Sequence, residues 1–283
     1  MVSTSIFNCY SSVYIRNLQR SFGLTLAAML AFPNAKINLG LHITRKRTDG
    51  FHELETIFYP VKTMKDALEI VPAKTDVSKL HLSGLQVDGD TGNNLVWRAY
   101  ELIKESYPER VPALDIYLLK AIPMGAGLGG GSADAAFALQ LLNEYCQLDI
   151  SDAELEKLAL QLGSDCPFFI RNSPQYATGR GEIMEPIDID LSEYRIEVVC
   201  PEVHVSTKEA FSGILPKPGS FDLRELPKIP VPEWKQVLKN DFEPTVFKQY
   251  PEIARIKEKF YADGALYASM SGSGSAVYGI FEK

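Results

Sequence analysis

The sequence has no long apolar run, because none of its hydrophobic stretches reaches the about 18 residues that a membrane-spanning helix needs. Cysteine is also scarce, and the four cysteines stand too far apart for a metal-binding or redox motif, which indicates reduced, buried thiols. Basic residues are outnumbered, since 29 Lys and Arg face 36 Asp and Glu for a net charge of −7. Nucleic-acid backbones require clustered positive charge, so we expect neither a nucleic-acid nor a membrane partner.

The start of the chain lacks acidic residues: residues 1–28 contain five serines and two arginines but no Asp or Glu. One interpretation is a transit or signal segment, and a genuine transit segment would place the protein in a plastid. The other is a misassigned start, with translation beginning at Met29. We favour the second interpretation, set residues 1–30 aside as an N-terminal extension or misassigned start, and expect a cytoplasmic protein.

Glycine, by contrast, is concentrated in one segment. Five glycines fall within residues 125–131 and form a glycine loop. A chain accepts the backbone entropy cost of so many glycines where a ligand must approach bare N–H groups. A strand pattern over residues 114–119 precedes the loop and helical spacing over 135–142 follows it, so the loop stands at a helix N-terminus, which favours anions. We therefore predict a phosphate cradle; the alternative is a flexible surface linker. The five glycines are Gly125, Gly127, Gly129, Gly130 and Gly131.

The loop differs from two common phosphate-binding motifs. No Gly-Lys-Ser/Thr closes it, which excludes a Walker P-loop. No acidic residue ends a second strand at the distance that a dinucleotide-binding fold requires. The phosphate cradle must therefore belong to another class of fold.

Strand and helix patterns are mixed along the chain without strict alternation, which predicts an α+β fold. A polar hairpin at residues 45–50 joins the first strands, and the capping box Ser151–Glu154 opens one of the helices. Five prolines indicate a long loop over 213–233, and acidic residues with a proline place a domain boundary near 185–195. We expect strands over 35–71, 114–119, 194–200 and 267–281, and helices over 94–104, 152–162 and 251–263.

Three segments in a fixed order point to a known family. They are Pro33-Asn34-Ala35-Lys36-Ile37-Asn38-Leu39, the glycine loop, and Met270-Ser271-Gly272-Ser273-Gly274. Their order resembles the GHMP kinase superfamily. The resemblance covers residues 31–283 and implies a two-domain α+β fold, with a ribosomal-S5-like, ATP-binding N-terminal domain over 31–190 and a ferredoxin-like C-terminal domain over 191–283.

Two further segments narrow the resemblance to a subgroup whose acceptor is a small molecule, a cytidine diphosphate derivative. These segments run from Thr48 to Leu54 and from Gly163 to Phe169. A rival interpretation is another GHMP kinase of a small alcohol, of the mevalonate or homoserine type. A different class altogether is a non-catalytic binding module on the same fold. For the oligomeric state we expect a monomer or a weak homodimer.

The resemblance implies a catalytic pair, Lys36 and Asp165. Asp165 precedes an apolar run, where partial desolvation would suit a general base, and Lys36 is a lone cation in an apolar strand. The alternative for this pair is a structural salt bridge. Cys166, beside Asp165, is assigned no role.

The resemblance also implies an ATP site built on the glycine loop. Asn94 and Leu95 match positions near the adenine. Mg²⁺ is expected to arrive on ATP, without a metal site of the protein's own, and Ser132 offers the hydroxyl of the loop. The nucleotide-binding residues implied in the loop are Pro123, Met124, Gly125, Ala126, Gly127, Leu128, Gly129, Gly130, Gly131 and Ser132.

Five positions match acceptor contacts of the subgroup. Asn38 matches a contact to the alcohol end of the acceptor, and His52 one to the cytosine. Phe51 and Phe211 match aromatic positions that sandwich the cytosine ring, and Thr207 matches a hydroxyl contact nearby. The alternative is ordinary: the two phenylalanines belong to the core and His52 is a hydrogen-bonded hairpin histidine.

Overall fold

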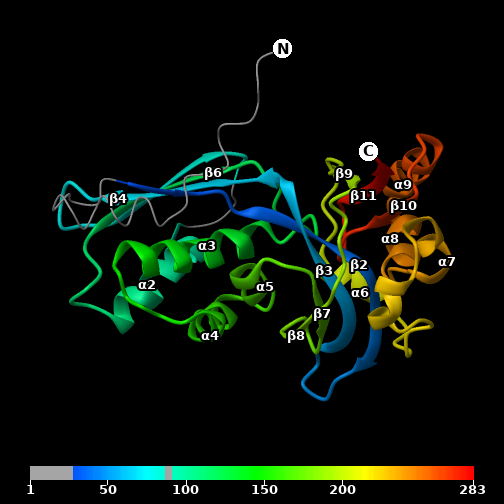
Figure 1. Cartoon of the computed structure of the whole chain (residues 1–283), viewed down its shortest axis with the longest axis horizontal. Helices are drawn as coiled ribbons and strands as arrows, with labels where there is room; N and C mark the ends of the chain where they lie inside the picture. The colour runs from blue at the N-terminus through cyan, green and yellow to red at the C-terminus, as the bar shows by residue number, and fades with distance from the viewer. Residues whose placement is uncertain (1–27, 87–90) are drawn as a thin grey trace, which may run out of the picture.

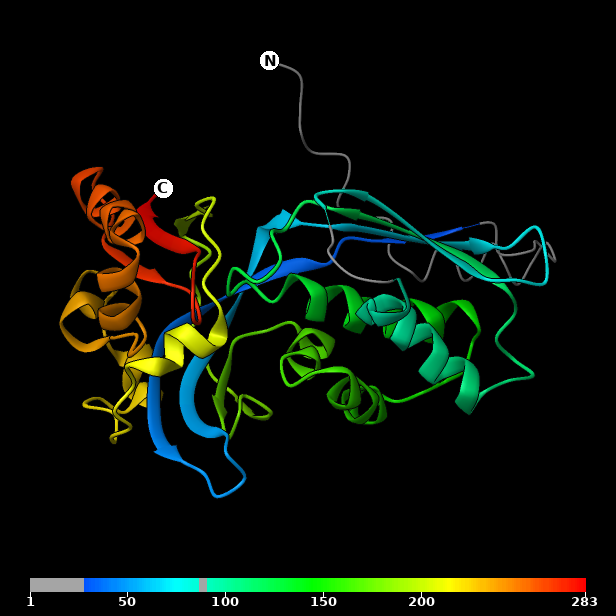
Figure 2. The same ribbon diagram turned by 180° about the vertical axis from the view of Figure 1, so that it is seen from behind.

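A long antiparallel hairpin of β2 (Asn34–Lys46) and β3 (His52–Lys65) runs through the centre of the molecule. The computed structural model describes residues 28–86 and 91–283. In Figures 1 and 2 the hairpin curves from a helical N-terminal half into the C-terminal half. Strand β2 is buried along most of its length because elements of both halves pack against it.

A four-stranded sheet in the order β1–β4–β6–β5 forms one layer of the N-terminal half. The predicted alternation over 114–119 is confirmed, since Leu114, Ile116 and Leu118 are buried while Tyr117 and Leu119 are exposed. The extension predicted at the start of the chain lies, up to residue 27, outside the described residues. The strands are β1 (Met29–Ala31), β4 (Ala67–Pro72), β5 (Lys79–Gly84) and β6 (Leu114–Lys120).

Helices cover the buried face of this sheet (Figure 1). The predicted capping box is confirmed: Ser151 Oγ accepts the N–H of Glu154, and the Glu154 carboxylate accepts the N–H of Ser151. Among the described residues, no helix is long and apolar enough to cross a membrane. The elements are η1 (Thr91–Asn93), α2 (Leu95–Ser106), α3 (Gly130–Tyr145), α4 (Asp152–Leu162) and α5 (Cys166–Arg171).

Two short strands widen the central hairpin into the sheet β2–β3–β7–β8. They are β7 (Gln175–Thr178) and β8 (Ile183–Pro186), and sequence analysis did not predict them because four residues are too few to show alternation. The C-terminal half has an antiparallel sheet in the order β10–β11–β9, formed by strands that the apolar patterns predict over 194–200 and 267–281. Its strands are β9 (Tyr194–Val199), β10 (Tyr267–Met270) and β11 (Val277–Glu282).

The prediction of a long loop over 213–233 needs correction. This segment contains the 3₁₀ helices η2 (Leu223–Lys228) and η3 (Val231–Glu233). Pro232 occupies the first turn of η3, where proline is tolerated. In η2 the buried side chains of Leu223 and Leu226 pack into the core. The other helices of this half are α6 (Thr207–Ser212), α7 (Trp234–Val237), α8 (Glu243–Gln249) and α9 (Pro251–Ala262).

The hydrophobic core of the C-terminal half includes residues from the start of the chain. Ile37 and Leu39 on β2 pack in one cluster with Leu223, Tyr267 and Tyr278. The backbone of Leu41 continues this contact, because its N–H donates to Lys239 O at 2.9 Å. The hairpin therefore contributes to the hydrophobic core of the C-terminal half as well as to the N-terminal half. The domain limits 31–190 and 191–283 stay a prediction.

A buried charge cluster stands where β6 leads into the glycine loop. Lys120 Nζ donates to one oxygen of Asp66 and, at 2.7 Å, to Asp134 Oδ2 on α3. The other oxygen of Asp66 accepts the N–H groups of Ala121 and Ile122, at 2.5 and 2.8 Å. The cluster therefore ties the strand before the loop to the helix after it.

One of the two carboxylates in this cluster has fewer hydrogen bonds than the other. Oδ1 of Asp134 is buried without a hydrogen-bond partner in the described structure, and one ammonium cannot balance two carboxylates. Burial raises the pKa of Asp134 to about 7, although the charge of Lys120 opposes the rise. Asp134 therefore takes up a proton more readily than an exposed aspartate does.

This placement predicts a pH-dependent effect of Asp134→Asn on stability. Between its pKa in the unfolded chain, about 4, and its folded value of about 7, the wild-type native state holds a proton that the unfolded chain has released. Wild-type stability therefore falls as pH rises through this window, whereas Asn has no proton to lose. Relative to the wild type, the variant should gain about 3 kcal/mol in unfolding free energy from pH ~4.5 to ~7.5. Urea unfolding at a series of pH values measures the difference; a difference that stays constant with pH contradicts the assignment.

Candidate active site

Lys36 and Asp165 lie together, as the sequence predicts. Lys36 is in the middle of β2, and Asp165 is the residue that precedes α5. Lys36 Nζ and Asp165 Oδ2 are 3.5 Å apart, and the two side chains are 5% and 33% exposed. The carboxylate, rather than the ammonium, is therefore the member of the pair that an incoming group can reach.

Three groups surround the Lys36 ammonium. Nζ donates to Asn38 Oδ1 at 2.7 Å and lies 4.7 Å from the centre of the Phe58 ring, and the third group is the Asp165 carboxylate. Burial lowers the pKa of Lys36, while the charge and the hydrogen bond of Asp165 oppose that change. The lysine is therefore held in one position, with its charge directed at the carboxylate.

Asn38 is engaged within the protein. Its Oδ1 accepts from Lys36 and also from Ser271 Oγ at 3.4 Å, while its Nδ2 donates to Thr56 Oγ1 at 3.0 Å. Its backbone carbonyl accepts the hydroxyl of Tyr278 at 2.8 Å. These bonds make Asn38 a group that orients Lys36, and its predicted contact with the acceptor stays a prediction.

The glycine loop is bonded to two distant segments. Leu128 O accepts the N–H of Lys36 at 2.9 Å, and Ala126 O accepts the N–H of Ala276 at 3.1 Å. Gly127 O accepts Ser271 Oγ at 2.8 Å, and a Cβ at Gly127 would lie 2.1 Å from Ser271 O. Only glycine fits this approach, so the loop closes onto the turn between β10 and β11.

The end of the loop opens α3. Its first-turn N–H groups, at residues 130–132, have no acceptor within the helix by geometry, and the helix dipole adds positive potential there. Before them the loop presents the exposed Met124 and the half-buried Pro123, and the ring of His204 lies 3.1 Å from where a Cβ of Gly125 would be. The loop thus has the form of an anion cradle, with His204 as a neighbour that sequence analysis missed.

Two adjacent glycines of the loop face different sides. A Cβ at Gly130 would lie 2.8 Å from Ile122 and 3.3 Å from Lys120 Nζ, so this position faces the core. A Cβ at Gly131 would meet only Leu95, at 3.9 Å. Gly131 therefore borders the open side and brings Leu95, a predicted adenine neighbour, next to the loop. Asn94 caps α2, with its side chain accepting the N–H of Val96.

The side chains of Ser132 and Cys166 share a hydrogen bond next to Asp165 in the chain. Burial raises the pKa of Cys166 to about 12, and a hydrogen bond with the Ser132 side chain only partly opposes the rise. The thiol therefore stays protonated at neutral pH, which agrees with the prediction that it has no chemical role. Cys146, Cys166 and Cys200 are free cysteines, and Cys9 lies outside the described residues.

The residues predicted to hold cytosine lie at the turn between β2 and β3 and on α6. His52 stacks on Phe211, with ring centres 4.6 Å apart and planes 25° apart. Phe51 is 53% exposed, and the Arg180 guanidinium covers its ring at 4.9 Å. Thr207 is exposed at the start of α6. The structure pairs Phe211 with His52 and Phe51 with Arg180, so the sandwich of Phe51 and Phe211 stays a prediction.

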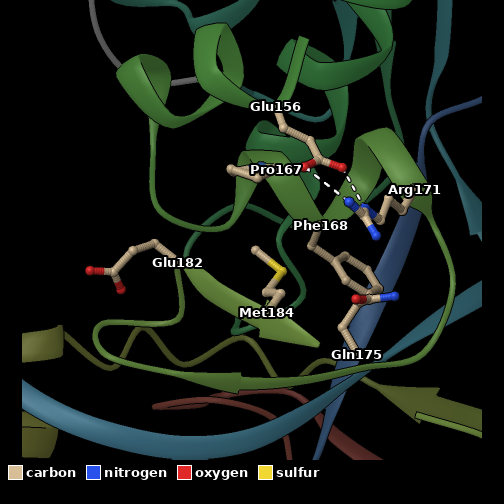
Figure 3. Close-up of a pocket in the computed structure, with 7 residues that line it drawn as sticks. All are labelled: Glu156, Pro167, Phe168, Arg171, Gln175, Glu182 and Met184. Carbon is tan, nitrogen blue, oxygen red and sulfur yellow. Dashed lines mark hydrogen bonds and ion pairs between the residues drawn. The ribbon is translucent and has the colours of Figure 1, made fainter. Parts of the chain in front are cut away.

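A separate cavity lies between α4, α5 and the strands β7 and β8 (Figure 3). At one side of it Arg171 Nε donates to Glu156 Oε1 at 2.5 Å. Neither Lys36 nor Asp165 lines this cavity, so it is distinct from the Lys36–Asp165 pair. The lining residues are Glu156, Pro167, Phe168, Arg171, Gln175, Glu182 and Met184.

Two family models match the chain, the GHMP kinases N terminal domain over residues 94–173 and GHMP kinases C terminal over residues 224–283. A relative from Parabacteroides distasonis, named 4-diphosphocytidyl-2-C-methyl-D-erythritol kinase, is 53% identical over 255 residues, which are 90% of this chain and 92% of the relative. The chain belongs to the GHMP kinase family. A relative of the same name from Cytophaga hutchinsonii is 47% identical over 254 residues, which are 89% of this chain and 92% of the relative.

Solved structures confirm the two-domain α+β fold of this GHMP kinase. A crystal structure of 4-(cytidine 5'-diphospho)-2C-methyl-D-erythritol kinase is similar with a TM-score of 0.75 and 31% identity, covering 89% of this chain and 90% of that one. The mevalonate kinase of Methanococcus jannaschii has a TM-score of 0.61 at 16% identity, covering 92% of each chain. The second likeness concerns the fold alone.

The Lys36–Asp165 geometry predicts the effect of removing the carboxylate. Asp165→Asn should lower kcat by about 10²-fold or more, because the amide cannot accept the acceptor's proton, while the Kd of ATP changes little. Asp190→Asn, at an exposed aspartate, is the matched control and should leave kcat unchanged. Steady-state kinetics and calorimetric ATP binding measure the two quantities. Near wild-type turnover in Asp165→Asn would remove the role of general base.

The orientation of Gly131 predicts a graded effect on nucleotide binding. Gly131→Val places a branched side chain on the open side of the cradle and should raise the Kd of ATP about tenfold or more. Gly131→Ala, with a single methyl group at 3.9 Å from Leu95, should have a much smaller effect. ATP titration with a melting curve as a fold control distinguishes the variants, and an unchanged Kd in folded Gly131→Val would show that the loop does not hold phosphate.

Proposed function

We propose that this GHMP kinase transfers the γ-phosphoryl group of ATP to the 2-hydroxyl of 4-diphosphocytidyl-2-C-methyl-D-erythritol, a step in the methylerythritol phosphate route to isoprenoid precursors. The observation that carries the proposal is the Lys36–Asp165 pair beside the glycine loop. The names of relatives with about half of their residues identical support the choice of acceptor.

The chain's own groups suit phosphoryl transfer, which depends mostly on positioning and on stabilisation of charge. In the proposal, Asp165 accepts the proton of the attacking hydroxyl, because its carboxylate is the exposed member of the pair. Lys36 stands beside it and stabilises the negative charge that develops on the transferred group. The first-turn N–H groups of α3 hold the phosphates of ATP.

Mg²⁺ enters this proposal on the phosphates of ATP, whose charge it neutralises when bound. Among residues 28–86 and 91–283, no group of three or more His, Cys, Asp or Glu side chains could hold a metal ion. The hydroxyl of Ser132, at the end of the loop, is an oxygen ligand of the kind that Mg²⁺ accepts. A cytoplasmic enzyme that is a monomer or a weak homodimer completes the proposal.

The rival functions differ in their acceptor. A kinase of mevalonate or homoserine has no cytosine to hold, whereas the stacked pair of His52 and Phe211 beside the exposed Phe51 offers flat aromatic surfaces. A non-catalytic binding module would not need a buried lysine aimed at a carboxylate.

Transfer of labelled phosphate tests the proposed function. With γ-labelled ATP and Mg²⁺, label should pass to 4-diphosphocytidyl-2-C-methyl-D-erythritol at a kcat/KM about 30- to 10⁴-fold above that for mevalonate or homoserine. The small alcohols cannot make two aromatic or charged contacts, each of which is worth about 1–3 kcal/mol. Label on mevalonate or homoserine at equal efficiency would favour the rival kinase. Absence of label on all three acceptors in a folded, ATP-binding preparation would favour the binding module.

A further inference from the structure

One cation at the acceptor side of the site has no assigned role. Arg180 occupies the turn between β7 and β8, next to Gly181. Its guanidinium lies 4.9 Å from the centre of the Phe51 ring. A Cβ on the neighbouring Gly181 would lie 3.7 Å from Asp165 Oδ1 and 3.3 Å from the Phe58 ring. One short turn therefore reaches from the reacting carboxylate to the hairpin aromatics.

This turn is held against the hairpin by the backbone. The N–H of Leu54 on β3 donates to Gly179 O at 2.8 Å, and the N–H of Gly181 donates to Thr178 O at 3.0 Å. The position from which the Arg180 side chain starts is therefore fixed relative to Phe51 and His52. Its guanidinium is the part of the turn that can move toward a bound molecule.

The guanidinium is only loosely paired. Arg180 Nε lies 3.6 Å from Glu182 Oε1, and the arginine side chain is 39% exposed. The same glutamate accepts the backbone N–H of Arg180 through its other oxygen, so it keeps a partner when the guanidinium turns away. The Arg180 side chain can therefore move away from Glu182 without leaving that carboxylate unpaired.

Three other cations of the hairpin already have carboxylate partners. Lys36 is buried against Asp165, Arg45 pairs with Glu53, and Arg47 lies 3.0 Å from Asp49. Desolvation raises the pKa of Asp49, but hydrogen bonds from Phe51 and Arg47 and the positive charges of Arg47 and Arg180 outweigh it and lower that pKa. Arg180 thus faces the hairpin as a loosely held positive charge between the hairpin tip and Asp165.

The proposed acceptor requires a positive charge in this place. It carries two phosphates between its cytidine and its alcohol, so an acceptor with its hydroxyl at Asp165 and its base near Phe51 runs its diphosphate past the turn at 179–181. The protein as a whole has a net charge of −7, so the diphosphate needs a local cation. A guanidinium is suited to two phosphate oxygens at once.

We propose that Arg180 is a specificity-determining residue that binds the diphosphate of the acceptor, so that the enzyme distinguishes a nucleoside diphosphate from the bare nucleoside. This assignment rests on the proposed function, because it takes the acceptor to be a cytidine diphosphate derivative. Arg180 leaves Glu182 and turns from the face of Phe51 toward the phosphates. The freed face of Phe51 is then available to the base.

The chain contains a closely matched control for Arg180. Arg195, on β9, lies 4.5 Å from the centre of the Phe281 ring and pairs with Glu197, two residues further along. It therefore shares with Arg180 both the aromatic contact and the neighbouring glutamate, but it belongs to the C-terminal sheet. An effect of Arg180→Gln that Arg195→Gln does not share is specific to the acceptor side.

Calorimetric titration of cytidine, CMP and CDP tests the proposal. Arg180→Gln should weaken CDP binding about 10- to 100-fold, CMP less, and cytidine and ATP by less than about 2-fold, because only the contact to phosphate is lost. Arg180→Lys, which keeps the charge but not the planar fork, should lie between the wild type and Arg180→Gln. Arg195→Gln should bind all four ligands like the wild type.

Two results would overturn the assignment of Arg180. Equal weakening of CDP and cytidine would make Arg180 a support for Phe51 rather than a phosphate ligand, and unchanged CDP binding would leave it no role with the acceptor. Failure of the wild type to bind both CDP and cytidine is a different result, because it overturns the proposed function and, with it, the assignment. A melting curve for each variant shows that a loss of binding is not a loss of fold.

Discussion

A lysine ammonium buried against one partly exposed carboxylate is the constraint on which the site depends. Removing a charge from water is costly unless opposite charge and hydrogen bonds replace the water. For Lys36 the replacements are Asp165, Asn38 Oδ1 and the face of Phe58, and they come from β2, β3 and the start of α5. The central hairpin and α5 must be in place together for the lysine to be buried, so the Lys36–Asp165 pair forms only when the fold does.

The glycine loop extends this constraint to both halves of the chain. Its carbonyl oxygens bond to β2 and to the segment after β10, and Gly127 approaches Ser271 more closely than any side chain would permit. On the other side, Lys120 joins the strand before the loop to the helix after it. The loop therefore gains a fixed shape from its surroundings, although its own glycines favour freedom.

Sequence patterns predicted the parts of the structure that depend on local chemistry. The alternation over β6 and the capping box of α4 follow from residue types at fixed spacings. The pairing of Lys36 with Asp165 was implied by the resemblance to GHMP kinases, and the structure places the two side chains together. Strands β7 and β8 were too short to show a pattern, and with them the position of Arg180 was missed. The stacking of His52 on Phe211 joins segments far apart in the chain, which no local pattern can show.

A crystal structure of the enzyme with 4-diphosphocytidyl-2-C-methyl-D-erythritol and a non-hydrolysable ATP analogue tests the central claim most directly. The account predicts the acceptor's 2-hydroxyl within about 3 Å of an Asp165 oxygen, with the terminal phosphate of the analogue at the first turn of α3. An acceptor hydroxyl bound away from Asp165, or phosphates that avoid the glycine loop, would contradict it.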